Sequence, residues 1–220
     1  MVSSKNNNFK SAIIVGLSGQ GVIMTTRLMS EVAVREGLNV NTYEVLGTAH
    51  RGTLVFSFVR MSENIKEFSN QIPAGEADLL IGFEPLEALR LGMLWMSEEG
   101  LAILNTKRVI PIYESLGKDV FSDEPRPRGY PPNEEISDFL ESTGATVMTV
   151  DASEIAEKLG NKVVVNTVML GMAVASGVLP LSKETFKDTI KILAPEGTAE
   201  LNLQAFQTGI DTLPENPRSI

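Results

Sequence analysis

Two short segments combine the residue types that bind anionic groups, and the first is Gly16-Leu17-Ser18-Gly19-Gln20-Gly21. Glycines allow a tight turn, and the free N–H groups at the start of a following helix favour an anion. Gly16 and Gly21 match the first and third glycines of the dinucleotide fingerprint, but Ser18 stands at the second. The acidic candidate for a ribose contact, Glu44, falls slightly late in the chain, and no Lys follows Gly21 as in a Walker A loop. The segment predicts either a phosphate-binding turn or a purely structural one.

The second segment runs from Gly47 to Gly52 and contains His50 and Arg51. Arg51 offers a rigid fork of donors for a phosphate or carboxylate, and His50 is an acid or base near neutral pH. The segment follows a predicted strand, and open α/β sheets bind ligands beyond the carboxyl ends of their strands. A ligand contact is therefore one interpretation, and an ordinary polar contact within a loop is the other.

Composition excludes several chemistries within these 220 residues. There is no Cys and a single His, so neither a Cys-ligated iron–sulfur cluster nor a multi-His metal site is possible here. The formal charge of −9 disfavours nucleic-acid binding, which needs clustered Lys and Arg. The apolar stretch 163–179 is shorter than the ~20 residues of a membrane span, so we expect a buried core helix instead. The polar N-terminus lacks an export signal, and a cytoplasmic protein is expected.

Short apolar runs alternate with helical patterns along the chain. This alternation predicts an α/β fold, with a Rossmann-like open, mainly parallel sheet flanked by helices and a helical C-terminal third over 152–209. We expect one domain over 11–213, with a flexible N-terminus (1–10), a Pro-rich loop (119–133) and a tail (214–220). The expected strands are 12–15, 38–45, 54–60, 77–83, 100–105 and 145–150, and the first helices are 22–36 and 84–96.

Several motifs in a fixed order resemble the gamma-type subunits of the 2-oxoacid:ferredoxin oxidoreductase family, and among them the small (beta) subunits of the indolepyruvate type. The motifs are G-x-S-G-Q-G-V, E-V-x-G-x-A-H-R-G followed by V-F-S-F-V-R, a buried strand ending at Glu84, N-T-V-M-L-G, and N-x-x-A-F-x-x-G. Together they span residues 11–210. The chain departs from the family at Ser18 (Gly in the family), His50 (commonly Gln) and Thr53 (Gly).

The resemblance implies an enzyme that oxidatively decarboxylates a 2-oxoacid with coenzyme A, using thiamine diphosphate and iron–sulfur clusters, and passes electrons to ferredoxin. In the indolepyruvate type these cofactors reside in a larger partner subunit. This chain is then the small companion subunit, inactive alone, with no cofactor and no catalytic residue of its own. It is expected to pack against the larger subunit and to line the crevice that coenzyme A or the 2-oxoacid enters.

Nine residues are the expected contacts with substrate, coenzyme A or the partner subunit: Gly16, Ser18, Gly19, Gln20, Gly21, Gly47, His50, Arg51 and Gly52. Three alternatives stay open at this point. The chain could serve another 2-oxoacid such as pyruvate or 2-oxoglutarate. It could be a free-standing reductase that binds NAD or FAD, or a scaffold whose motif loops form only a subunit interface.

Overall fold

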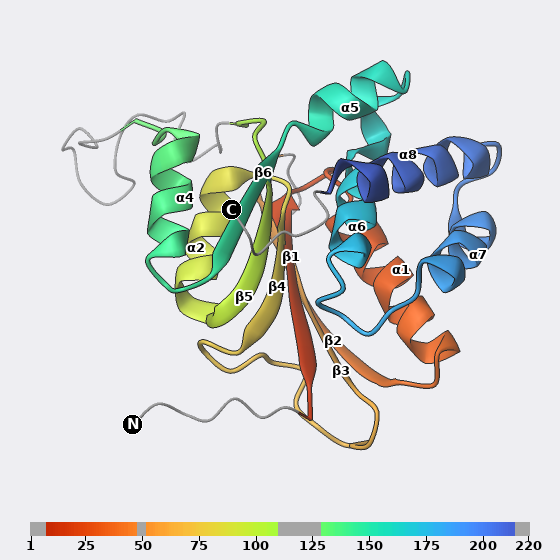
Figure 1. The fold of residues 1–220 in the computed structure, drawn as a ribbon, viewed down its shortest axis with the longest axis horizontal. Helices are drawn as coiled ribbons and strands as arrows, with labels where there is room; N and C mark the ends of the chain where they lie inside the picture. The colour runs from red at the N-terminus through yellow and green to blue at the C-terminus, as the bar shows by residue number, and fades with distance from the viewer. Residues whose placement is uncertain (1–7, 48–51, 110–128, 214–220) are drawn as a thin grey trace.

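The computed structural model of the chain describes residues 8–47, 52–109 and 129–213. A six-stranded sheet in the order β2-β3-β1-β4-β5-β6 lies between helices on both faces (Figure 1). The strands are β1 (Lys10–Leu17), β2 (Asn39–Leu46), β3 (Leu54–Ser62), β4 (Ala77–Gly82), β5 (Met96–Asn105) and β6 (Thr146–Val150). The helices are α1 (Val22–Arg35), α2 (Pro85–Trp95), α4 (Asn133–Glu141), α5 (Ala152–Lys158), the 3₁₀ turn η1 (Lys162–Val164), α6 (Val165–Ala175), α7 (Lys183–Leu193) and α8 (Ala199–Thr212).

The pairing confirms the predicted open, mainly parallel sheet, with one difference. β1, β4, β5 and β6 pair in parallel, whereas β3 runs antiparallel to both of its neighbours, β1 and β2. β3 therefore separates the two strands of the expected strand–helix–strand unit. The physical reason is the short connection of residues 47–53, because a short connection can join antiparallel strands while a parallel pair needs a long crossover. As a result, this connection lies at the same end of the sheet as the carboxyl end of β1.

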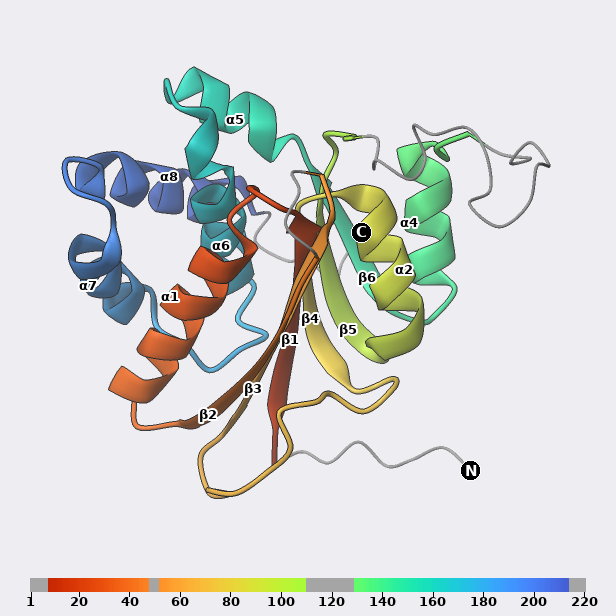
Figure 2. The same cartoon turned by 180° about the vertical axis from the view of Figure 1, so that it is seen from behind.

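Two helical layers cover the sheet (Figures 1 and 2). α1, α6, α7 and α8 lie on one face, and α2 and α4 lie on the other. The central strands β1 and β4 are buried on both faces, which explains why their sequences are continuously apolar. Residues 119–128 of the predicted Pro-rich loop, like residues 1–7 and 214–220, fall outside the described residues.

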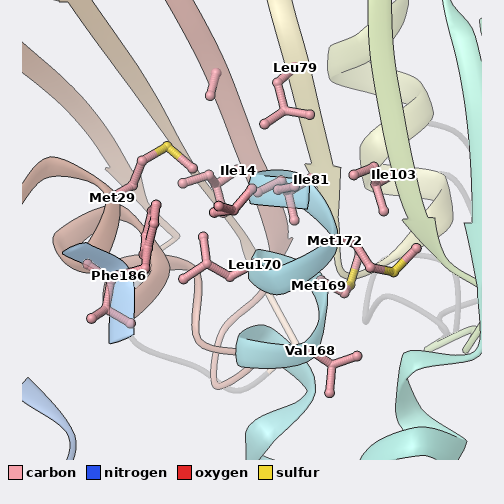
Figure 3. Packing of buried hydrophobic residues seen from close by; sticks show 14 of the residues in the cluster. Ile14, Met29, Leu79, Ile81, Ile103, Val168, Met169, Leu170, Met172 and Phe186 are labelled. Carbon is pink, nitrogen blue, oxygen red and sulfur yellow. The ribbon is translucent and has the colours of Figure 1, made fainter. Parts of the chain in front are cut away.

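The helix expected from the apolar stretch 163–179 is α6, which is shorter than the stretch and is buried from Asn166 to Val174 as predicted. Val163 was wrongly expected to be buried, because it lies in the preceding 3₁₀ turn and is 78% exposed. Figure 3 shows Leu170 of this helix beside Ile14 and Ile81 of the central strands. Leu170 has no exposed surface. In the described part of the chain, no helix combines the length and the apolar character that crossing a membrane requires.

α6 and α8 cross at two glycines that belong to the motifs quoted above. A Cβ on Gly171 would collide with the carbonyl oxygen of Phe206, and a Cβ on Gly209 would collide with that of Val168. The obstacles are backbone atoms on both sides, so glycine is what permits this close contact. The positions of these two glycines therefore have a packing explanation within the chain itself.

Candidate functional site

The turn from Gly16 to Gly21 joins β1 to α1, as the sequence predicted. Gly19 and Gly21 adopt left-handed backbone conformations, with φ of 96° and 89°, which favour glycine. Gly16 instead lies in close contact with the end of β4, because a Cβ there would stand 3.0 Å from the Cβ of Phe83. The turn thus needs its glycines for two different reasons.

Some backbone N–H groups of this turn donate within the chain, and others have no acceptor among the described residues. Three of them have acceptors within the chain: Leu17 N donates to Gln20 Oε1 (2.6 Å), Ser18 N to Thr53 O (2.9 Å) and Gln20 N to Leu17 O (3.0 Å). Among the described residues, the N–H groups of Gly19 and Gly21 have no acceptor. Gly21 is the N-cap of α1, and no side chain caps that helix. The donors left for a ligand are therefore at Gly19, Gly21 and the first turn of α1.

The second predicted segment lies beside this turn. Ser18 N donates to Thr53 O (2.9 Å), and Gly47 N donates to Leu54 O (3.1 Å), so the connection between β2 and β3 is bonded to the glycine turn. Gly52 has a φ of 85°, another left-handed conformation. His50 and Arg51 lie outside the described residues. The structure thus places Gly47 and Gly52 next to the turn and leaves the contacts of His50 and Arg51 a prediction.

A cavity of about 240 Å³ opens next to the turn, beyond the carboxyl ends of β4 and β5. We call it the carboxyl-end cavity, and open α/β sheets bind their ligands at this edge. Its lining residues are Gly19, Gln20, Phe83, Asn105, Lys107, Val109, Ser153, Glu157, Lys162, Val163 and Val165.

Two lysines give this cavity a positive balance. Lys162 Nζ lies 3.2 Å from Glu157 Oε1, so these two charges offset each other. Lys107 is in none of the ion pairs formed between described residues. Asn105 is buried, and its amide nitrogen donates to Phe83 O (3.3 Å) and Ser153 Oγ (3.0 Å). Among the described residues, the cavity therefore has an ordered polar floor and one lysine without a carboxylate partner, an arrangement that suits an anionic group.

A buried carboxyl group follows β4 at the same edge. Glu84 has no exposed surface, caps α2 by accepting from Glu87 N (2.9 Å), and accepts a hydrogen bond from the Tyr130 hydroxyl. Burial raises the pKa of Glu84. Burial and the neighbouring carboxyl also raise the pKa of Tyr130. This pair fixes the described end of the Pro-rich segment against the sheet.

The described residues do not fit the cofactors that the resemblance implies. No group of three or more His, Cys, Asp and Glu in the described part of the chain could hold a metal ion, and the sequence has no Cys. An iron–sulfur cluster needs thiolates, and a metal-bound diphosphate needs oxygen ligands such as carboxylates. The described residues therefore offer no ligand set for either group.

Five polar residues of the carboxyl-end cavity were not predicted from the sequence: Asn105, Lys107, Ser153, Glu157 and Lys162. Asn105 and Lys107 could have been predicted from the sequence, because polar residues at the carboxyl end of a buried parallel strand lie at the ligand-binding edge of the sheet. Ser153, Glu157 and Lys162 could not, since they come from helical segments far along the chain and reach the cavity through the fold.

Comparisons with known proteins agree with this architecture. The family model described as pyruvate ferredoxin/flavodoxin oxidoreductase matches residues 11–212. Indolepyruvate oxidoreductase subunit IorB of Methanothermobacter thermautotrophicus is 37% identical over 92% of this chain and 97% of its own length. The protein of the same name from Thermococcus kodakarensis is 31% identical over 92% and 95%.

Two solved structures share the fold. The gamma subunit of a keto/oxoacid ferredoxin oxidoreductase from Geobacter sulfurreducens has a TM-score of 0.64 and 23% identity over 92% of this chain and 96% of that one. A 2-oxoglutarate:ferredoxin oxidoreductase chain from Magnetococcus marinus has a TM-score of 0.67 and 18% identity, and the match covers 96% of this chain and 32% of that longer one. By sequence and by fold, this chain belongs to the pyruvate ferredoxin/flavodoxin oxidoreductase family.

Proposed function

We propose that the chain is the small subunit of an indolepyruvate-type 2-oxoacid:ferredoxin oxidoreductase. The observation that carries this proposal is the near full-length similarity to two relatives named indolepyruvate oxidoreductase subunit IorB. The reaction would be the oxidative decarboxylation of an aryl pyruvate with coenzyme A, with ferredoxin as electron acceptor. Thiamine diphosphate and the iron–sulfur clusters would belong to a larger partner subunit, so this chain alone would be inactive.

The role of this chain in that reaction would be to bind and orient an anionic group at the edge of the sheet. Gly19, whose N–H has no acceptor among the described residues, and Lys107, which forms no ion pair with a described carboxylate, both line the carboxyl-end cavity. A coenzyme A phosphate or a 2-oxoacid carboxylate matches these donors. Arg51, in the segment next to the turn, would add a bidentate contact, with His50 beside it in sequence. None of these residues makes or breaks a bond in the proposal.

A free-standing dinucleotide reductase is the weaker alternative. The dinucleotide fingerprint needs its second glycine because the backbone there must approach the pyrophosphate. In this chain that position is Ser18, and its N–H is already bonded to Thr53 O. The donors that remain, at Gly19 and Gly21, suit a single phosphate or carboxylate better than a pyrophosphate cradle.

The direct test of this site is Arg51→Lys in the enzyme reconstituted with its larger subunit. Lys keeps the charge but loses the bidentate fork, so we expect a rise in KM for coenzyme A or the 2-oxoacid worth about 1–3 kcal/mol. The control is Arg27→Lys, at an exposed position of α1, which should leave KM unchanged. Assembly measured on a sizing column should stay intact. Unchanged kinetics with dissociated subunits in Arg51→Ala would make Arg51 an interface residue and support a scaffold role instead.

A further inference from the structure

Lys107 lines the carboxyl-end cavity from a segment that has no helix or strand of its own. This segment, residues 106–109, follows directly after β5, and we call it the lysine segment. A lysine side chain has many rotamers, and its ammonium group binds an anion at a defined place only if the backbone that carries it is fixed. The position of Lys107 therefore depends on contacts between the lysine segment and other parts of the chain.

The side chain of Asn133 bridges the two chain neighbours of Lys107. Its amide nitrogen donates to the carbonyl oxygen of Thr106 at 2.9 Å, and its amide oxygen accepts from Arg108 Nε at 3.2 Å. Asn133 is the first residue of α4, and this helix packs on the sheet, so the amide is held in place. One asparagine thus fixes the chain immediately before and immediately after the lysine.

Tyr130 contacts the same segment through Arg108. The guanidinium carbon of Arg108 lies 5.4 Å from the centre of the Tyr130 ring, within the range of a cation–π contact. The Tyr130 hydroxyl donates to the fully buried Glu84 and accepts from Leu86 N at 3.1 Å, which anchors the ring to the start of α2. The ring therefore gives Arg108 a fixed surface next to Lys107.

These two side chains continue a support that the sheet provides only at the first residue of the segment. Thr106 N donates to Val150 O of β6 at 2.8 Å. Beyond that bond, Asn133 and Tyr130 supply the side-chain contacts described above. Both side chains are uncharged, and neither lines the carboxyl-end cavity. Their effect on a ligand there would therefore be geometric, because removing either one leaves the charge of the cavity unchanged.

We propose that Asn133 and Tyr130 are positioning residues that hold Lys107 where its ammonium group binds the anionic group of a ligand in the carboxyl-end cavity. This inference rests on the anionic site of the proposed function, and it adds two residues that act on that site without touching the ligand. The anionic group is a phosphate or a carboxylate, since both accept charge-assisted hydrogen bonds from an ammonium group. The test below uses binding, so it does not depend on enzyme activity.

The test is an NMR titration of the ¹⁵N-labelled full chain with two probes, inorganic phosphate and acetate, at constant ionic strength. The backbone amide signal of Gly19, which lines the same cavity, reports binding. The probe that binds more tightly identifies the anionic group as a phosphate or a carboxylate. If neither probe shifts this signal, the anionic site and the positioning role are both wrong, whereas the small-subunit function is decided separately by the activity of the reconstituted enzyme.

Lys107→Met should weaken the tighter probe about tenfold, the size of a hydrogen bond to a charged group. Asn133→Ala and Tyr130→Phe should each weaken it about three- to fivefold, because the ammonium group remains but is no longer held in place. The matched controls are Asn64→Ala, at an exposed asparagine, and Tyr43→Phe, in the aromatic cluster of β2 and β3, and both should bind as wild type does. Wild-type affinity in a folded Asn133→Ala or Tyr130→Phe chain would overturn the role of that residue.

A double-mutant cycle separates positioning of the lysine from a general effect on the fold. In a Lys107→Met background, Asn133→Ala and Tyr130→Phe should cause no further loss of binding, because no ammonium group is left to position. A residue with a purely structural role would weaken binding by the same factor in both backgrounds. Equal factors in the two backgrounds would therefore overturn the proposal.

Discussion

Substituting Gly209 tests whether the contact between α6 and α8 is as close as the structure shows. In Gly209→Ala the new Cβ would collide with the carbonyl oxygen of Val168 and stand 2.9 Å from its carbonyl carbon and 3.2 Å from the Cα of Gly171. Ordinary contacts begin at 3.4 Å. These neighbours are backbone atoms and cannot rotate away. Because the carbonyl oxygen of Val168 is the nearest obstacle, the helices must separate by more than about half an ångström at this point.

Two opposing effects set the size of the change. Alanine is a better helix former than glycine by about 1 kcal/mol, which favours the variant. Forcing an extra carbon into a packed core costs about 1–3 kcal/mol and more where backbone must move. We therefore expect Gly209→Ala to lower the free energy of unfolding by about 1–2 kcal/mol.

Gly92→Ala is the matched control, because Gly92 also lies inside a helix, α2. There the new Cβ would meet the ends of the Leu140 and Leu80 side chains, which can rotate. The same gain in helix propensity then offsets a smaller packing cost, so this variant should lose less than about 0.5 kcal/mol. The assay is urea unfolding followed by circular dichroism. Equal losses in the two variants, or a more stable Gly209→Ala, would refute the close helix contact.

Two further predictions concern the core and the buried carboxyl group. Leu170→Ala should lower the free energy of unfolding by about 2–5 kcal/mol, because Leu170 is fully buried; a loss below about 0.5 kcal/mol in urea unfolding would contradict that burial. The raised pKa of Glu84 means that the folded protein holds this proton more tightly than the unfolded chain, so stability falls as pH rises from the ordinary to the raised pKa. In Glu84→Gln, the free energy of unfolding measured in urea should therefore fall less over this pH range than it does in the wild type. An equal fall in the two proteins would refute the raised pKa of Glu84.

The sequence predicts the elements well where the signals are local. The buried run 12–15, the glycines after it and the apolar face of α1 lie within one stretch of chain, and each restricts the backbone by itself. The direction of β3 was not predictable in this way. Its apolar residues from Leu54 onward indicate a strand, but its place between β1 and β2 depends on pairing with strands elsewhere in the sheet.

The candidate site likewise combines residues that local sequence signals predict with residues that only the fold brings there. Gly16, Gly19 and Gly21 were predictable as turn residues, because a glycine-rich segment between a strand and a helix restricts the backbone locally. Lys162, by contrast, reaches the carboxyl-end cavity only because α6 packs across the sheet and brings the preceding turn with it.

The most direct test of the central claim is reconstitution of the chain with its larger subunit. The purified pair would be assayed for reduction of ferredoxin with coenzyme A and a panel of indolepyruvate, phenylpyruvate, pyruvate and 2-oxoglutarate. We expect a stable complex that oxidises the aryl pyruvates, no activity in either subunit alone, and neither iron nor flavin in this chain. A purified chain that binds no partner, or that carries stoichiometric flavin and oxidises NADH by itself, would contradict the proposed small-subunit function.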